Sequence, residues 1–354
     1  MAFQGRRVLW VDCAKAIGIL LIVLWHSPTQ IISEPYLLWV KACAVPLFFF
    51  LSGFFVQTDA DQKIVFIKKT RAILLPYFSG SIVALLGSYM ISGGVPKISD
   101  IGGVLYGSFH YLEWGPLWFL PHLFLVSLFS GFLILKFRVR KFVILLIAFF
   151  MLIINVLILD LIWVFDVSFL GFGSQDFKGW PFSLDLIFVS VFFYISGWVF
   201  YDFLKSDINP FFWFLVAVLF LTNVYFNGSA MDLALRRYDD PMFSTLYAVV
   251  GILMVIGIAK IISLSPRILK VFRVIGNSTL IILIFHEAIQ RRVYGYFESQ
   301  NLPFEVSGLL AFFVAILIPV VFSVFVFPRF KVLALAFNCQ YRPLGRWKSL
   351  IAKD

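Results

Sequence analysis

The stretch VDCAKAIGILLIVLWHSP, from Val11 to Pro28, is apolar along most of its length but carries three ionisable residues, Asp12, Lys15 and His26. On an α-helix that turns about 100° per residue, His26 returns to within about 20° of the direction of Lys15, and Asp12 lies within about 60° of it. The three residues therefore form one polar stripe on a single helix. Lys15 and His26 are about 16 Å apart along its axis.

The composition around this stretch indicates a membrane protein. The chain has 354 residues, of which 61% are hydrophobic and 14% charged, and its mean hydropathy is +0.96. In lipid every backbone polar group must be paired internally, which helices achieve within one segment. The apolar runs are continuous, without the alternation of a membrane β-barrel. We therefore predict an all-α, polytopic integral membrane protein.

We expect about ten transmembrane helices. The expected spans are residues 9–27, 37–57, 72–92, 115–135, 142–163, 182–203, 211–227, 243–263, 275–291 and 308–328. Lys and Arg are about three times as frequent on the side that holds both chain ends as on the other, which places both termini in the cytoplasm. We predict one transmembrane domain over residues 1–330 and a basic cytoplasmic tail over residues 331–354.

The net charge of +10 does not indicate a nucleic-acid-binding protein, because the basic residues are spread over short loops between apolar segments. The three cysteines, Cys13, Cys43 and Cys339, have no metal-ligand spacing and argue against a disulfide framework. We therefore expect the lipid bilayer as the surroundings of the chain, and neither nucleic acid nor a metal ion as a partner. These features leave the oligomeric state open.

Basic residues gather at the cytoplasmic side of two predicted spans. Lys15 lies in the first span, and Lys68, Lys69 and Arg71 precede the third. Such cations bind phosphate groups, although they also anchor helices to lipid phosphates. Asp12, one turn below Lys15, is the expected structural partner of its ammonium group. We expect the remaining positive charge to bind an anionic ligand that arrives from the cytoplasm.

The outer halves of the spans carry groups suited to proton transfer. His26 can take a proton from a hydroxyl at neutral pH. Asp185 lies at a similar depth, where it either orients an imidazole or is an interfacial carboxylate in contact with water. In the ninth span His286 and Glu287 are costly in lipid and indicate function. Because only one of them can face the first span well, we prefer His286.

The segment EWGPLWFLPHLF, which begins at Glu113, offers weaker candidates. We assign Trp114 to an interfacial aromatic belt, whereas the deeper Trp118 is a candidate for stacking against a substrate. Glu113 is a further substrate-binding candidate in the outer loop. His122 follows Pro121, and we interpret it as a partner for backbone groups freed by the proline.

Several of these motifs resemble the acyltransferase-3 family of bacterial membrane acyltransferases, nearest its fucose 4-O-acetylase-like branch. The motifs are DCAKAIGILLIVLWHS, VPLFFFLSGFF, FIKKTRAILLPY, GPLWFLPHLFLVSLF, FSLDLIFVSVFFYISGW and IGNSTLIILIFHEAI, in the family's order over about residues 7–290. The most specific is the Arg/Lys-x10-His pattern, which Lys15 and His26 match. Lys68 and Arg71 match a basic-x-x-Arg pair at the third span.

The resemblance implies an enzyme of the bacterial inner membrane that O-acylates, most commonly acetylates, a glycan hydroxyl. Its donor would be cytoplasmic acetyl-coenzyme A or another acyl-coenzyme A, with Lys15, Lys68 and Arg71 meeting the phosphates. His26 would be the general base or a transient acyl carrier. The hydroxyl would belong to a lipid-linked sugar or a growing polysaccharide.

Two other classes of function stay open at this stage. One is a transporter or flippase for a lipid-linked glycan, although the paired repeats and broken helices typical of many transporters are not evident in the sequence. The other is a non-catalytic subunit of a polysaccharide assembly complex.

Overall fold

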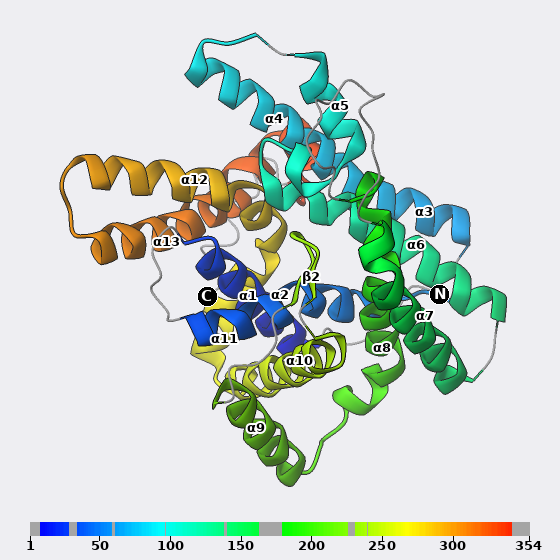
Figure 1. Ribbon diagram of the computed structural model, residues 1–354. Coiled ribbons are helices and arrows are strands. Elements are labelled where there is room, and N and C mark those ends of the chain that lie inside the picture. The colour runs from blue at the N-terminus through cyan, green and yellow to red at the C-terminus, as the bar shows by residue number, and fades with distance from the viewer. Residues whose placement is uncertain are drawn as a thin grey trace.

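The computed structural model describes residues 8–27, 34–58, 61–95, 97–137, 140–162, 179–225, 231–238 and 240–341. Most of these residues are helical (Figure 1), and a short hairpin pairs β1 Met231–Asp232 with β2 Arg237–Tyr238. The helices are α1 Leu9–Trp25, α2 Glu34–Gly53, α3 Gln62–Lys69, α4 Leu75–Ser92, α5 Ile98–Tyr106, α6 Phe119–Phe137, α7 Lys141–Ile162, α8 Ile187–Lys205, α9 Pro210–Tyr225, α10 Pro241–Ser263, α11 Pro266–Asn277, α12 Thr279–Ser299, α13 Phe304–Val321 and α14 Lys331–Ala336. The predicted all-α class is confirmed.

Among the described residues, 5 helical segments are long and apolar enough to cross a membrane. They are Gln62–Ile91, Gly115–Phe137, Pro181–Lys205, Pro241–Ser263 and Phe304–Arg329. The pair α11 and α12, bent by 72° at Ser278, is a sixth if it counts as one span. The polytopic class is therefore confirmed, whereas the number of ten spans stays a prediction, since α1 has only 17 residues and α9 only 16.

The third predicted span begins earlier than expected, at Gln62 rather than residue 72. The side chain of Asp61 caps this helix by accepting a hydrogen bond from the main-chain nitrogen of Lys63 at 2.8 Å. The helix then runs through a π-helical turn, Thr70–Leu74, into α4. Lys68 and Lys69 are therefore helical residues that belong to the candidate span.

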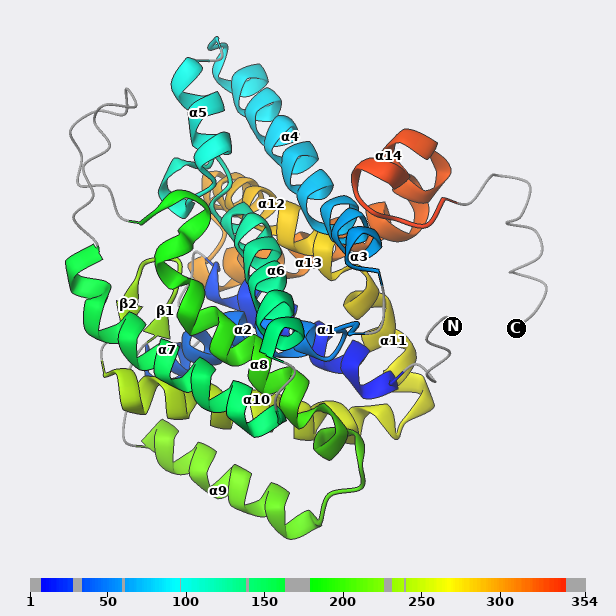
Figure 2. The ribbon, with the colours of Figure 1, turned by 90° about the vertical axis from the view of Figure 1, so that its right-hand side faces the viewer.

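Helix α1 lies at the centre of the molecule, in contact with α2, α10, α11, α12 and α13 (Figures 1 and 2). A helix that is apolar on nearly all sides is expected to be buried by its neighbours. In α1 the buried residues include the apolar Cys13, Ala14 and Ile19, and also Asp12. Of the polar stripe predicted on this helix, Asp12 is thus buried, whereas Lys15 and His26 are half-buried.

Helices α2 and α8 approach each other closely because glycines face the contact. A Cβ added to Gly53 would overlap the main-chain oxygen of Tyr194, and a Cβ on Gly197 would overlap that of Phe50. Small residues allow such close packing between membrane helices. This contact fixes α8, which carries Tyr194 and Ser196, against the centre of the fold.

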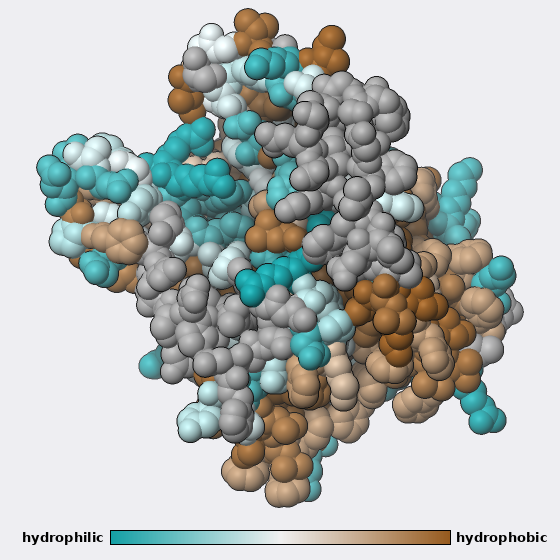
Figure 3. Space-filling model, viewed as in Figure 1, coloured by the Kyte–Doolittle hydropathy of each residue, from teal (hydrophilic) through white to brown (hydrophobic). Residues whose placement is uncertain are grey.

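The outer surface is strongly apolar over α7 and α9 (Figure 3), the latter lying at the edge of the molecule. Phe142 and Leu157 on α7 and Phe211 and Phe214 on α9 are each more than half exposed. Water does not stabilise so large an apolar face, so it is a lipid-facing surface. The predicted tail begins with α14, its residues 342–354 lie outside the described residues, and its cytoplasmic position stays a prediction.

Candidate active site

The structure brings His26 and His286 together. His26 follows the last residue of α1, and His286 lies on α12 and is fully buried. Nε2 of His286 is 3.5 Å from Nδ1 of His26, and the two rings meet edge to face with their centroids 5.0 Å apart. The preference for His286 over Glu287 as the neighbour of α1 thus agrees with the geometry.

The backbone fixes the tautomers of both rings. Nδ1 of His286 is 2.9 Å from the carbonyl oxygen of Ile282 and 3.0 Å from that of Leu283. Nδ1 of His26 is 2.9 Å from the carbonyl oxygen of Ile22. Because a carbonyl oxygen only accepts, each Nδ1 carries the proton and each Nε2 carries the lone pair of the neutral ring. The lone pair of His286 therefore faces the Nδ1–H of His26, and the basic atom of His26 is Nε2.

Lys15 lines a cavity of about 310 Å³ between α1, α6 and the junction of α11 with α12. Ile19 from α1, Leu120 from α6 and Leu283 from α12 contribute to the same wall. Leu283 precedes His286 by one helical turn, so α12 as well as α1 connects this cavity to the histidine pair. The pairing of Lys15 with the buried Asp12 stays a prediction.

A second cavity, of about 380 Å³, adjoins the first, because Ala72, Ile73 and Leu123 line both. It contains Lys68 and Lys69. Nζ of Lys15 lies 4.9 Å from the centroid of the Phe55 ring, which also lines this cavity. The structure thus gathers three cations from two helices around a pair of adjoining cavities.

The choice of Arg71 as the partner of Lys68 is corrected by Lys69. Arg71 is exposed and lines neither cavity. Nζ of Lys69 instead reaches inward and donates to the carbonyl oxygen of Ser127 and to the hydroxyl of Tyr194, both at 3.3 Å. Residues two apart on a helix point about 200° apart, so Arg71 faces away from the side on which Lys69 lies.

The bend between α11 and α12 completes the Lys15 cavity. A Cβ on Gly276 would overlap the main-chain oxygen of Asp12, so only glycine lets α11 approach α1 this closely. Asn277 and Thr279, on either side of the bend at Ser278, line the cavity. The IGNS sequence, predicted as the start of an uninterrupted span, is therefore the junction of two helices.

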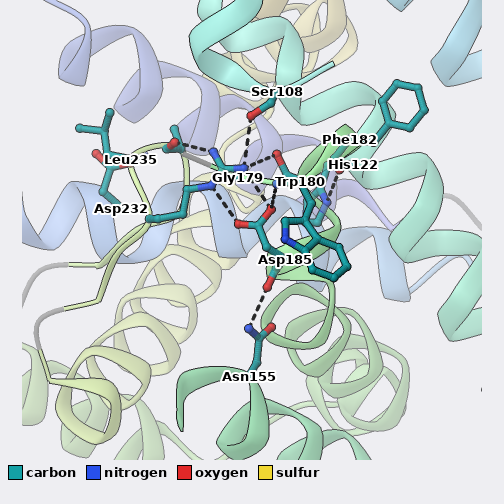
Figure 4. A network of polar contacts seen from close by, with 12 residues as sticks. Ser108, His122, Asn155, Gly179, Trp180, Phe182, Asp185, Asp232 and Leu235 are labelled. Atoms are coloured by element: carbon teal, nitrogen blue, oxygen red, sulfur yellow. Dashed lines mark hydrogen bonds and ion pairs between the residues drawn. The ribbon is translucent and has the colours of Figure 1, made fainter. Parts of the chain in front are cut away.

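Asp185 lies in a different cluster from His26 (Figure 4). Its carboxylate accepts hydrogen bonds from Nε and Nη2 of Arg236, at 3.0 and 3.3 Å, and from the main-chain nitrogen of Trp180 at 2.9 Å. Arg236 is 1% exposed and also donates to the hydroxyls of Ser108 and Ser183. The contact expected between Asp185 and a catalytic imidazole is thus replaced by a buried ion pair, because the guanidinium takes both carboxylate oxygens.

Tyr106 closes this cluster from α5. Its hydroxyl donates to the carbonyl oxygen of Gly179 at 2.8 Å. Burial, assisted by the negative charge of Asp185, raises the pKa of Tyr106 to about 12, so the phenol keeps its proton as a hydrogen-bond donor. Sequence reasoning missed Arg236, and the only signal was that an acidic residue within a membrane helix needs a cationic partner.

Trp118 and His122 pack against each other inside the protein. Trp118 is 3% exposed, and its ring centroid is 5.6 Å from that of His122. Its ring is covered by protein, and the role of Trp118 in substrate binding stays a prediction. His122 contacts the carbonyl oxygen of Phe182 at 3.1 Å and the hydroxyl of Ser190 at 2.8 Å. Glu113 is exposed, and its role stays a prediction.

The fold defines a polytopic, all-helical membrane protein. The chain matches the family model described as an acyltransferase domain over residues 8–327, and it belongs to this acyltransferase-3 family. No curated protein and no solved structure matches the chain significantly. The predicted family is confirmed, and the protein is a membrane acyltransferase. Its place in the fucose 4-O-acetylase-like branch stays a prediction.

Proposed function

We propose that the protein is an O-acetyltransferase of the bacterial inner membrane. It transfers an acetyl group from cytoplasmic acetyl-coenzyme A to a hydroxyl of a lipid-linked sugar or cell-surface polysaccharide. The observation that carries this proposal is the contact of His26 with His286 at one end of α1, while Lys15 of the same helix lines a cavity nearer its start. A cation and a base on one helix suit an anionic donor and a hydroxyl substrate.

The chemistry assigned to His26 follows from its tautomer. Nε2 takes the proton of the substrate hydroxyl as the oxygen attacks the thioester carbonyl, and an ester bond forms. The carbon–sulfur bond breaks, and the protonated imidazole returns its proton to the sulfur of coenzyme A. His286 is a positioning residue, since its Nε2 contacts the ring of His26 at Nδ1. In the alternative mechanism, Nε2 of His26 carries the acetyl group transiently and attacks the thioester carbonyl with the same lone pair.

The donor's phosphate groups are assigned to Lys15, Lys68 and Lys69, with Arg71 as an outer contact. Support comes from the two adjoining cavities, which these three lysines line. Lys69 is half-buried, and its hydrogen-bond partners Ser127 and Tyr194 offer only dipoles, which leaves its ammonium group suited to an anionic ligand.

The proposal is tested with the purified full-length protein, radiolabelled acetyl-coenzyme A and a panel of lipid-linked sugars. The wild type and the His110→Ala control, altered in an exposed loop residue, are expected to transfer the label, and His26→Ala is not. If label is bound to the wild-type protein before sugar is added, the mechanism is the one in which His26 carries the acetyl group. Movement of the lipid-linked sugar across the membrane without acetylation contradicts the proposal and favours a transporter.

A further inference from the structure

Two buried oxygen atoms on α12, beside the histidine pair, have no hydrogen-bond partner in the described part of the chain. They are Oε2 of Glu287 and Oε1 of Gln290. Glu287 is 6% exposed and Gln290 is fully buried. Native proteins pair nearly all such atoms, so two neighbouring exceptions need an explanation.

The remaining atoms of both side chains are held in place. Oε1 of Glu287 forms an ion pair with Arg291, one turn further along α12. Nε2 of Gln290 donates to the carbonyl oxygen of Val23, at 3.2 Å, and Val23 lies on α1 three residues before His26. Because a carbonyl oxygen only accepts, the amide cannot be reversed, and Oε1 is the atom left without a partner.

The polarity of the two atoms limits what they can bind. A carboxylate oxygen and an amide oxygen only accept hydrogen bonds, so a ligand must bring donors. Residues three apart on a helix are neighbours, with about 5–6 Å between their Cβ atoms. That spacing suits two hydroxyls on one sugar ring better than a single donor. His286 precedes Glu287 directly, so the two oxygens lie on the helix that also supports His26.

We propose that Glu287 and Gln290 form the subsite that recognises the sugar, each accepting a hydrogen bond from a ring hydroxyl while another hydroxyl meets Nε2 of His26. This inference rests on the proposed function and adds the residues that select the hydroxyl substrate. A site built to bind hydroxyls rejects analogues that lack them, since its polar atoms then stay unpaired. The enzyme thereby prefers a polyhydroxylated ring to a simple alcohol.

The test uses the full-length protein in lipid nanodiscs with radiolabelled acetyl-coenzyme A. Methyl glucoside, methyl galactoside and methyl fucoside serve as polyhydroxyl probes, and 1-butanol serves as the probe with one hydroxyl. Glu287→Gln retains the bond to Arg291 but can replace the unpaired acceptor with a donor. Gln290→Met keeps the size of the side chain without its polar atoms. Glu298→Gln, at an exposed site on α12, is the matched control.

Each variant is expected to raise the KM for the best glycoside about tenfold, the effect of one lost hydrogen bond to a polar group. The KM for acetyl-coenzyme A and the rate with 1-butanol stay unchanged, as does every parameter of Glu298→Gln. If both variants retain the wild-type KM for the glycoside, the subsite is wrong. If the wild type acetylates 1-butanol and no glycoside, the subsite is also wrong, whereas O-acetyl transfer stands. Absence of transfer to every probe and lipid-linked sugar overturns the proposed function itself.

Discussion

The Asp185–Arg236 cluster and the His26–His286 pair are both polar groups buried in an apolar fold, but they differ in how completely they are paired. Both side chains of the ion pair are 0% exposed, and serine, tryptophan and alanine groups bind the rest of the cluster. In the histidine pair each Nδ1 contacts a backbone carbonyl oxygen, the two rings have one long contact with each other, and two unpaired oxygens lie beside the pair. A complete network stabilises the fold, whereas an incomplete one retains atoms for a ligand.

The largest expected effect on the rate of acetyl transfer distinguishes His26 from His122. His26→Ala should lower the rate of acetyl transfer by about 10²–10⁴-fold, the usual contribution of a general base, with an unchanged unfolding temperature. His122→Ala should do the reverse, because His122 is buried, bonded to the backbone of Phe182 and the hydroxyl of Ser190, and packed against Trp118. Transfer rates and thermal unfolding of both variants are the measurements. A folded His122→Ala enzyme without activity would break the comparison.

The next effect concerns the stability of the complete network. Asp185→Asn or Arg236→Met should each lower the free energy of unfolding by about 3–5 kcal/mol, because each leaves a buried polar group without its partner. The double variant Asp185→Leu with Arg236→Met should recover much of this loss.

The control for that experiment is the exposed ion pair between Lys141 and Asp202, whose side chains are 42% and 74% exposed. Lys141→Met should change the free energy of unfolding by less than about 1 kcal/mol. Unfolding in detergent, followed by circular dichroism, measures all four variants. Equal losses for the buried and exposed pairs would contradict the structural role of Asp185.

The smallest expected effect is on donor binding. Lys69→Ala should raise the KM for acetyl-coenzyme A about ten- to thirtyfold, as expected for a lost charge-assisted contact, and Arg71→Ala should change it less than about threefold. The contrast should persist at high salt, because the exposed charge of Arg71 is screened more than the half-buried charge of Lys69. Initial rates at several donor concentrations measure both variants. A larger effect for Arg71→Ala would restore the assignment made from the sequence motif.

Composition and periodicity sufficed for the parts of the site that lie on one helix. The apolar run from Val11 to Pro28 predicts α1, and the helical period places Lys15 and His26 on one stripe. The cost of ionisable groups in lipid then points to His286. These inferences need only local geometry and solvation.

The partners of side chains that meet from distant segments were not predictable. Asp185 binds Arg236, which is 51 residues away and lies in the turn of a short hairpin whose fold the sequence does not determine locally. The π-helical turn at Thr70–Leu74 lies between Lys69 and the rest of its span, and no residue pattern in the sequence predicted this turn. Packing between distant segments decides which side chains meet, so the choice between Lys69 and Arg71 required coordinates.

The 72° bend between α11 and α12 lies beside the cavity that Lys15 lines. Helix α11 exposes Arg267, Lys270 and Arg273, as expected of a helix that rests on the bilayer surface, whereas the first turns of α12, residues 280–285, are apolar. Lys15 lines the cavity at this bend, and His26 lies about 16 Å further along α1. Under the proposed function, only the thioester arm of the donor has to span that distance, while its nucleotide end stays beside the lysines.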